Sequence, residues 1–314
     1  MKSKRFFQII FVFLILILLL ITGCTEIMNT INNKIEYEKQ PTTLSYNISY
    51  GCRINCTGNG EYKINYDCNT PEIIKGTITN INALDEEYTD KFNIASFNDI
   101  KNWNINKKGK CNNYEFGISA SVISETFYVS DLNGKEALTI DEINNSHPEL
   151  VKNYCKPQAN KSNIFIDPNN QDIKIKAIEI YNSSNSDNSF IIAKEIFKWL
   201  KQNTEYKIHY DKNQVQTCSF TFNEKTGDCD DLTFLYLSLC KSLDIPCRFI
   251  KGYLIDPEET IGHVWAEVFV GNNIGDNGWI PVECAGSGVG SVNSEVEIHQ
   301  NFGMETPDHL RLFK

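Results

Sequence analysis

The stretch from Thr226 to Leu254, TGDCDDLTFLYLSLCKSLDIPCRFIKGYL, most constrains how this chain of 314 residues can fold. A Gly-Asp turn leads into an apolar-periodic segment, which predicts a helix ending before Asp244-Ile245-Pro246. A β-type run from Cys247 to Leu254 follows. Cys229 stands where the turn becomes the helix, and there the free N–H groups and the helix dipole favour a thiolate. The sequence therefore predicts that Cys229 is a nucleophile.

A cysteine nucleophile needs a base close by, and we expect His263 to supply it. His263 lies in a predicted strand in which Val264, Ala266, Val268 and Val270 form one face and His263, Trp265, Glu267 and Phe269 form the other. If the aliphatic face enters the core, His263 faces a cleft, and Trp265 either walls that cleft or packs. The other histidines are weaker candidates: His147 in a helix-capping turn, His209 in a polar stretch, and His299 and His309 in the C-terminal tail.

The imidazole in turn needs a group that accepts its second N–H, and we predict Glu283 for this role. Glu267 is closer in sequence, but four strand residues place it about 13 Å from His263. Glu283 lies on the polar face of the next predicted strand, across a hairpin from His263 within a residue or two of register. Asp228 is a further candidate to line the cleft. The Cys229 N–H is expected in an oxyanion hole, with Gln214 and Gln216 as candidate side-chain donors.

This arrangement resembles the transglutaminase-like superfamily of papain-fold cysteine enzymes, over about residues 160 to 285. It looks closest to an archaeal family of transglutaminase-like membrane proteins without an assigned activity. Its third catalytic residue is usually Asp, whereas this chain has Glu283, whose extra methylene could place the carboxylate differently. The matching segments are Phe197-Lys198-Trp199-Leu200, Tyr206, Gly227-Asp228-Cys229-Asp230-Asp231, Leu243-Asp244-Ile245-Pro246-Cys247-Arg248-Phe249, Gly252-Tyr253, Gly262-His263-Val264-Trp265-Ala266-Glu267-Val268 and Trp279-Ile280-Pro281-Val282-Glu283.

The resemblance implies an α+β catalytic domain with Cys229 as nucleophile, His263 as base and acid, and Glu283 as the residue that orients His263. We therefore expect a cysteine hydrolase that cleaves amide bonds of a peptide or protein substrate through a thioester. An acyl transferase that cross-links envelope proteins is one alternative, and a catalytically inactive envelope-binding module is another. No cofactor or catalytic metal is predicted, and the oligomeric state is not predicted.

The N-terminus predicts export. Lys2, Lys4 and Arg5 precede an apolar run from Phe6 to Ile21, and Ile21-Thr22-Gly23-Cys24 resembles a lipobox whose cysteine is lipidated after cleavage. The alternative is an uncleaved membrane anchor, because the run is close to the roughly 18 residues that a span needs. Either interpretation places the remaining chain outside the cell membrane. The net charge of −10 argues against a nucleic-acid partner.

Five segments follow from these patterns: a signal or anchor over 1–24, a linker over 25–43, an antiparallel β domain over 44–135, a helical connector over 136–160 and a catalytic domain over 161–314. Within the β domain, two alternating runs flank Gly58-Asn59-Gly60 and predict a β-hairpin. Such a hairpin would bring Cys52 opposite Cys68, or one step away, and permit a disulfide. A zinc site formed by Cys52, Cys56 and Cys68 is the alternative.

Overall fold

The computed structural model describes residues 42–84, 100–130, 133–208, 215–256, 258, 260–285, 298 and 300–313. Residues Thr43–Lys314 form one compact unit. The predicted signal or anchor, including Cys24, and the linker up to residue 41 lie outside the described residues. Among the helices that the structure does describe, none combines the length and apolar character needed to cross a bilayer.

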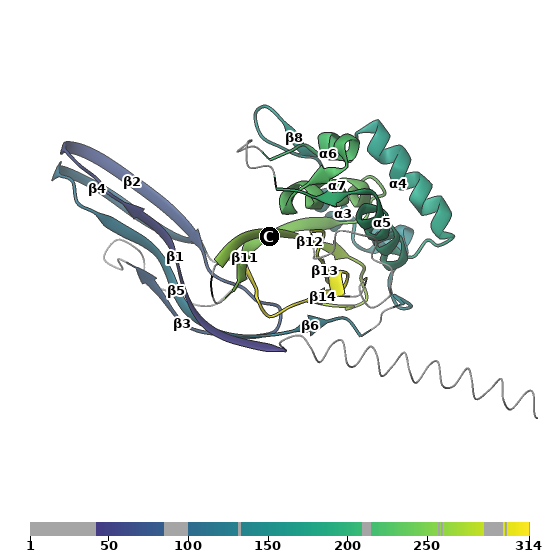
Figure 1. Cartoon of the computed structure of the whole chain (residues 1–314), viewed down its shortest axis with the longest axis horizontal. Coiled ribbons are helices and arrows are strands. Elements are labelled where there is room, and N and C mark those ends of the chain that lie inside the picture. Colours follow the sequence, from purple (N-terminus) through teal and green to yellow (C-terminus); the bar gives the residue numbers. More distant parts are fainter. Residues whose placement is uncertain are drawn as a thin grey trace, which may run out of the picture. The chain divides into compact units, whose positions relative to one another are not determined.

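Long antiparallel strands build the N-terminal part of the unit (Figure 1). They are β1 (Thr43–Ile54), β2 (Asn59–Asn69), β3 (Gly76–Leu84), β4 (Ile100–Lys110), β5 (Tyr114–Glu125) and the short β6 (Phe127–Tyr128). One sheet has the order β1-β5-β3, and β2 pairs with β4 in a second sheet. Alternate side chains enter a shared core around Trp103 and Phe116, both fully buried, which accounts for the period-two pattern in the sequence.

The predicted hairpin about Asn59 is wrong. β1 pairs along its whole length with β5, and β2 pairs with β4, so consecutive strands lie in different sheets. Asn59 begins β2 opposite Lys110 and is not the tip of a two-strand turn. Alternation along a strand specifies which side chains face the core, but it does not specify which strand is the neighbour.

The cysteine pairing changes accordingly. Cys52 and Cys68 are free thiols, contrary to the predicted bridge, because Cys52 lies opposite Phe116 and Cys68 opposite Lys101. A disulfide instead joins Cys56 to Cys111. This bridge connects the β1–β2 loop to the β4–β5 loop, and it removes Cys56 from the alternative zinc site.

Helices and a second sheet form the C-terminal part. The helices are α2 (Ile140–Ser146), α3 (Pro148–Tyr154), α4 (Gln171–Ser184), α5 (Ser189–Asn203), α6 (Cys218–Glu224) and α7 (Cys229–Lys241). The strands are β7 (Gln158–Ala159), β8 (Ile164–Ile166), β9 (Glu205–Tyr206), β10 (Thr226–Gly227), β11 (Cys247–Ile255), β12 (Thr260–Phe269), β13 (Trp279–Val282), β14 (Met304–Glu305) and β15 (His309–Phe313). This combination confirms the mixed fold with antiparallel sheets.

The main sheet has the order β13-β12-β11-β15, and α5 and α7 pack against its aliphatic face. Ala266 and Val268 of β12, and Val270 directly after it, enter this core, as the strand pattern predicts. The amphipathic stripe of α5, including Phe197 and Leu200, is buried in the same core. The helix α7 and the strands β11 and β12 therefore form the scaffold on which Cys229 and His263 are held.

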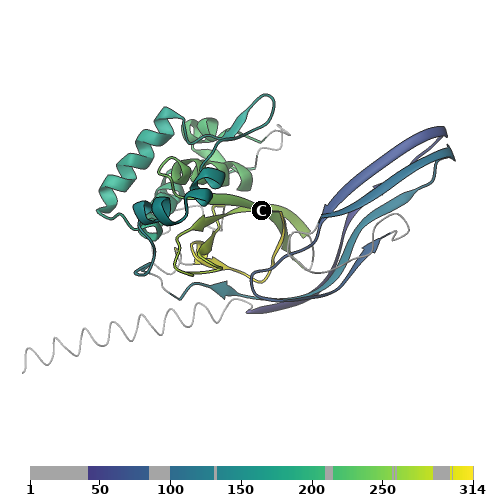
Figure 2. The ribbon, with the colours of Figure 1, turned by 180° about the vertical axis from the view of Figure 1, so that it is seen from behind.

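The last strand, β15, completes this sheet and is drawn in yellow beside β11 (Figure 2). β15 can lie this close to β11 only because residue 252 is glycine. A Cβ at Gly252 would lie 1.9 Å from the carbonyl oxygen of Leu310. Arg311 also exchanges two backbone hydrogen bonds with Glu72, between β2 and β3. The C-terminal residues are thus part of the sheet that carries the candidate site.

Candidate active site

Cys229 is the first residue of α7, as the sequence predicts, and Asp228 is the N-cap. The preceding strand β10 lies parallel to β9, which places the turn before Cys229. Gly227 is required in this turn, because a Cβ there would lie 2.5 Å from the Cβ of Asp231. The first N–H groups of a helix have no partner within the helix, so this terminus can donate hydrogen bonds to a bound carbonyl oxygen.

The helix meets β12 at the peptide next to His263. The Cys229 thiol accepts a hydrogen bond from the backbone N–H of Val264. One turn later, the Thr233 hydroxyl donates to the Val264 carbonyl at 3.4 Å. Residues four apart lie on one face of a helix, so this pair anchors the start of α7 to the strand beside His263.

The thiol is neutral at rest, contrary to the expectation of a depressed pKa. Burial raises the pKa of Cys229 to about 12, and the negative charges of Asp230, Asp228 and Glu283 add to this effect. The hydrogen bond from the Val264 N–H lowers the pKa of Cys229, but by less than burial raises it. Desolvation of a buried thiolate therefore outweighs the helix terminus at this position.

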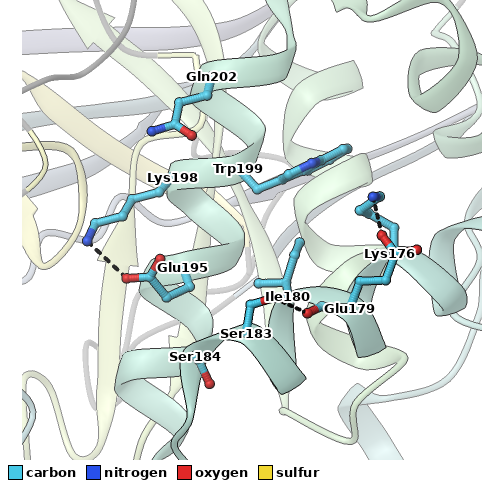
Figure 3. Close-up of a pocket in the computed structure, with 9 residues that line it drawn as sticks. All are labelled: Lys176, Glu179, Ile180, Ser183, Ser184, Glu195, Lys198, Trp199 and Gln202. Atoms are coloured by element: carbon cyan, nitrogen blue, oxygen red, sulfur yellow. Dashed lines mark hydrogen bonds and ion pairs between the residues drawn. The ribbon is translucent and has the colours of Figure 1, made fainter.

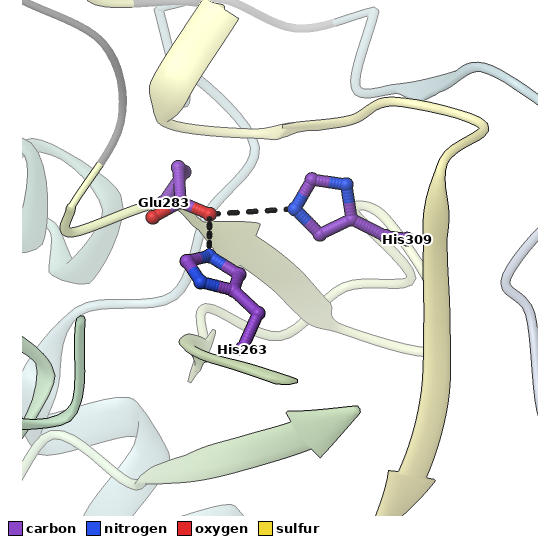
Figure 4. A group of neighbouring side chains, drawn as sticks. All are labelled: His263, Glu283 and His309. Carbon is purple, nitrogen blue, oxygen red and sulfur yellow. Dashed lines mark hydrogen bonds and ion pairs between the residues drawn. The ribbon is translucent and has the colours of Figure 1, made fainter. Parts of the chain in front are cut away.

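His263 and Glu283 are in direct contact. The His263 Nε2 lies 2.7 Å from Glu283 Oε2 (Figure 4). The register of β12 with β13 pairs Ala266 with Val282, so Glu283 follows one residue beyond, diagonal to His263 on the same face. A carboxylate at Nε2 selects the tautomer with its proton on that nitrogen and leaves the Nδ1 lone pair available.

His309 also contacts Glu283, although its place in the sequence suggested only a tail residue. Its Nε2 lies 3.3 Å from the same carboxylate oxygen that His263 contacts (Figure 4). The other oxygen, Oε1, accepts the backbone N–H of Ala285 at 2.9 Å. Burial opposes ionisation of Glu283, but hydrogen bonds from the two imidazoles hold its pKa well below the usual range. No local motif marks His309, because only the pairing of β15 with β11 brings it here.

Trp265 is buried beneath this site and does not wall an open cleft. Only 1% of it is exposed, and its Nε1 donates to Glu305 Oε2 at 2.9 Å. The C-terminal segment covers the face of β12 that was expected to line a cleft, because Glu305 and Arg311 pack against it. Trp265 instead stacks on His263, with ring centroids 5.8 Å apart.

Glu267 belongs to a separate buried ion-pair network. Arg248 donates to its Oε2 at 2.8 Å and Arg311 to its Oε1 at 2.5 Å. Although burial opposes ionisation, the two guanidinium groups keep the pKa of Glu267 low. Arg311 also binds Glu305, which in turn accepts from Trp265. Glu267 thus supports the fold near the site without contacting His263.

The acidic residues around Cys229 have different roles. Asp231 accepts hydrogen bonds from the backbone N–H groups of Gln216 and Asp228, which closes the turn before the helix. The Gln216 side chain also donates to Asp231, at 2.7 Å, which uses one of the two hydrogens on its Nε2. Gln214 lies outside the described residues. Asp228 is half-buried beside Cys229 and is hydrogen-bonded to Asp230, whose pKa is raised to about 8 by burial and by this neighbour.

Two groups have residue types that bind divalent metals: His263, Glu283 and His309, and Asp228, Cys229 and Asp230. In the first group, the atoms that would face an ion already form hydrogen bonds with one another. In the second, the Asp230 side chain is hydrogen-bonded to Asp228. We therefore describe both as hydrogen-bonded groups.

A pocket between α4 and α5 is separate from this site (Figure 3). Ser183 and Ser184 in its lining donate to carbonyl oxygens of their own helix. Lys198 and Glu195 pair with each other, at 2.9 Å. These groups satisfy one another and form no nucleophile–base pair, so the pocket does not compete with Cys229 and His263 as the catalytic site.

A family model described as the transglutaminase-like superfamily matches residues 177–284. Among solved structures, a protein from Cytophaga hutchinsonii described as a candidate cysteine protease is 16% identical, with 77% of this chain and 79% of that chain covered and a TM-score of 0.42. The periplasmic domain of TgpA from Pseudomonas aeruginosa is 11% identical, with 72% and 71% covered and a TM-score of 0.35. No curated protein is significantly similar in sequence to the chain.

Proposed function

Because the chain belongs to the transglutaminase-like superfamily through residues 177–284, we propose that it is a cysteine hydrolase that cleaves amide bonds with Cys229, His263 and Glu283. The observation that carries the proposal is the 2.7 Å contact of His263 Nε2 with Glu283, next to the peptide that binds the Cys229 thiol. A nucleophile, a base and a group that orients the base are the parts that thiol catalysis needs.

The reaction starts from the protonated thiol, because burial raises the pKa of Cys229. As the Cys229 sulfur forms a bond to the amide carbonyl carbon, its proton passes to Nδ1 of His263. When the tetrahedral intermediate collapses, the C–N bond breaks, His263 returns the proton to the leaving amine, and a thioester remains. Water, deprotonated by the same imidazole, then attacks the thioester and releases the acid. Glu283 stabilises the imidazolium that forms in each step.

The oxyanion of the intermediate would lie at the start of α7. The backbone N–H of Cys229 is available there, and the helix dipole favours negative charge at this end. Asp231 holds Gln216 Nε2 through one of its two hydrogens, so the second hydrogen remains a candidate side-chain donor beside the backbone N–H of the helix start.

Acyl transfer remains the alternative reaction, since it shares the thioester and differs only in the acceptor. A primary amine in place of water would produce a cross-link. The third interpretation, an inactive envelope-binding module, does not account for a buried carboxylate that binds His263, the residue before the Val264 peptide that contacts the Cys229 thiol. We also propose that the N-terminal 24 residues tether the protein outside the cell membrane, where its substrate would be a peptide or protein of the envelope.

The test uses an activated ester, because such an ester reports on the nucleophile without the natural substrate. Full-length protein treated with p-nitrophenyl acetate should gain one acetyl group on Cys229, detected by intact mass and peptide mapping. Cys229→Ala should abolish this modification. His263→Ala should slow it by about 10²–10⁴, the usual contribution of general-base catalysis.

Cys155→Ala is the matched control, since Cys155 is another half-buried free thiol, and it should leave the rate unchanged. Equal acylation of Cys229 and Cys155 would contradict the proposal and support the binding module. A glutamine peptide with and without a primary amine then distinguishes hydrolysis, which releases ammonia alone, from transfer, which also yields a conjugate.

A further inference from the structure

His309 lies outside the residues that match the family model, yet its ring is in the candidate site. Its Nε2 approaches the Glu283 oxygen that also contacts His263, so one carboxylate oxygen lies between two imidazole rings (Figure 4). The two ring centroids are 5.8 Å apart. Glu283 is therefore not a simple third member of a triad, because it has a second imidazole partner.

The second nitrogen of His309 is also engaged. Its Nδ1 lies 2.9 Å from the Thr306 hydroxyl and 3.1 Å from Asp308 Oδ1. A carboxylate at each ring nitrogen requires a proton on each, so His309 is an imidazolium. Burial opposes this charge, but the hydrogen bonds with Asp308 and Glu283, together with the charge of Glu305, raise the pKa of His309 to about 10.

Packing holds the ring in this orientation. His309 is nearly buried and lies edge-on to Trp265, with ring centroids 4.9 Å apart. Trp265 is itself fixed by Glu305, which Arg311 binds through two nitrogens. The charged and titratable groups around His309 are Glu283 after β13, Glu305 on β14, Asp308 before β15, Arg311 on β15, His263 on β12 and Tyr46 on β1, beside Asp308.

We infer that His309 is a positioning residue of the Cys229–His263–Glu283 site, which keeps Glu283 in place and balances its charge. This inference rests on the proposed function. With its charge balanced, Glu283 accepts the Nε2–H of His263 without drawing a second proton onto that ring. The Nδ1 lone pair of His263 is then left for the proton of the Cys229 thiol.

Without His309, no cation would balance the negative charge of Glu283, and His263 would face the full charge of this carboxylate. An uncompensated charge at this distance stabilises imidazolium and would hold His263 in the form that cannot accept a proton. The neutral Cys229 thiol in this structure is consistent with an uncharged resting pair.

The kinetic test compares wild type with His309→Gln, which keeps an N–H donor but loses the charge. The acylation of Cys229 by p-nitrophenyl acetate should be about tenfold slower or more, a fraction of the general-base contribution. The acid limb of its pH–rate profile should also move to higher pH, because uncompensated Glu283 keeps His263 protonated over a wider range. A purely structural role would lower stability without moving that limb. His147→Gln is the matched control. The His147 ring packs against Phe269, with ring centroids 5.0 Å apart, and not against Glu283.

A second measurement does not depend on activity. In Cys229→Ala protein with ¹⁵N-labelled histidines, His309 should remain imidazolium at pH 8, and His263 should be neutral with its proton on Nε2. A neutral His309, or an unmoved acid limb in His309→Gln, would overturn the inference. If His309→Gln does not fold, Asp308→Asn removes the other carboxylate partner and should move the limb in the same direction. Absence of acylation in wild type with His309 still charged would refute the proposed function alone.

Discussion

Three side chains from three segments determine the protonation state at the centre of the site. Cys229 is neutral because burial at the helix start outweighs the favourable N–H groups. Glu283 is ionised although it is buried, because two imidazoles hydrogen-bond to it. His309 carries the compensating charge. The charge of the site therefore depends on all three groups together, and not on the thiol alone.

The charge of His309 makes a prediction about stability. Its pKa is raised from 6.5 to about 10 in the folded protein, so the charge stabilises the fold fully below pH 6.5. This stabilisation is lost as pH rises through about 10, because the folded state then also releases the proton. The difference in unfolding free energy between wild type and His309→Gln should therefore be largest near pH 6 and shrink toward pH 10.

Urea unfolding at several pH values measures this difference. For His147→Gln, the difference in unfolding free energy from wild type should not shrink between pH 6 and pH 10. This variant controls for the general effect of replacing a histidine. A difference between wild type and His309→Gln that grows with pH would contradict the assigned charge.

At the scale of elements, β15 connects the site to the sheet. It pairs with β11 on one side, and Arg311 bridges to Glu72 on the other. Leu310 is buried with Ile73 and Val122 of the N-terminal strands. The strand that supplies His309 is therefore held by both the catalytic sheet and the β-rich region.

Gly252 tests the importance of this strand. In Gly252→Ala, the new methyl group would meet the Leu310 carbonyl oxygen at 1.9 Å and the Trp265 ring at 3.0 Å. β15 must then shift, which should cost about 1–3 kcal/mol of unfolding free energy, as overpacking usually does. Cys229 acylation should also slow, because His309 moves with the strand. Urea unfolding and the activated-ester assay measure the two effects.

Gly262 offers a matched control, since it lies opposite Tyr253 on the adjacent strand and a Cβ at that position would meet nothing within 4 Å. Gly262→Ala should therefore leave the site intact. Equal losses in the two variants would indicate that β-strand glycines are sensitive for a reason unrelated to β15.

At the scale of the whole molecule, we predict that the N-terminal segment decides where the protein acts. If Cys24 is lipidated, the mature protein in the membrane fraction should lack residues 1–23 and carry lipid on Cys24, as measured by intact mass. Cys24→Ala should carry no lipid, whereas Cys155→Ala should be processed like wild type. A wild-type protein that keeps residues 1–23 without lipid would show that this segment is a membrane anchor instead.

Much of the catalytic region follows from the sequence. Cys229 at a helix start, the aliphatic face of β12, and Glu283 within reach of His263 are local features, since each depends on periodicity or on a hairpin between neighbouring strands. The helix after the Asn170 turn and the stripe of α5 are local as well. The helix-capping turn predicted around His147 falls between two helices, since α2 ends at Ser146 and α3 starts at Pro148. Such boundaries shift because neighbouring turns compete for the same residues.

The sequence by itself thus predicted Cys229 at a helix start and Glu283 within reach of His263, because these features depend on periodicity and on neighbouring strands. The roles of nucleophile and base stay predictions. Only the tertiary structure decided that His309 joins these residues, that Trp265 is covered, and that Cys56 bridges to Cys111 instead of Cys52 to Cys68. It also decided that Cys229 is a neutral thiol. These features depend on pairing between distant strands and on burial. Local patterns do not encode either, because alternation specifies a face but not a partner.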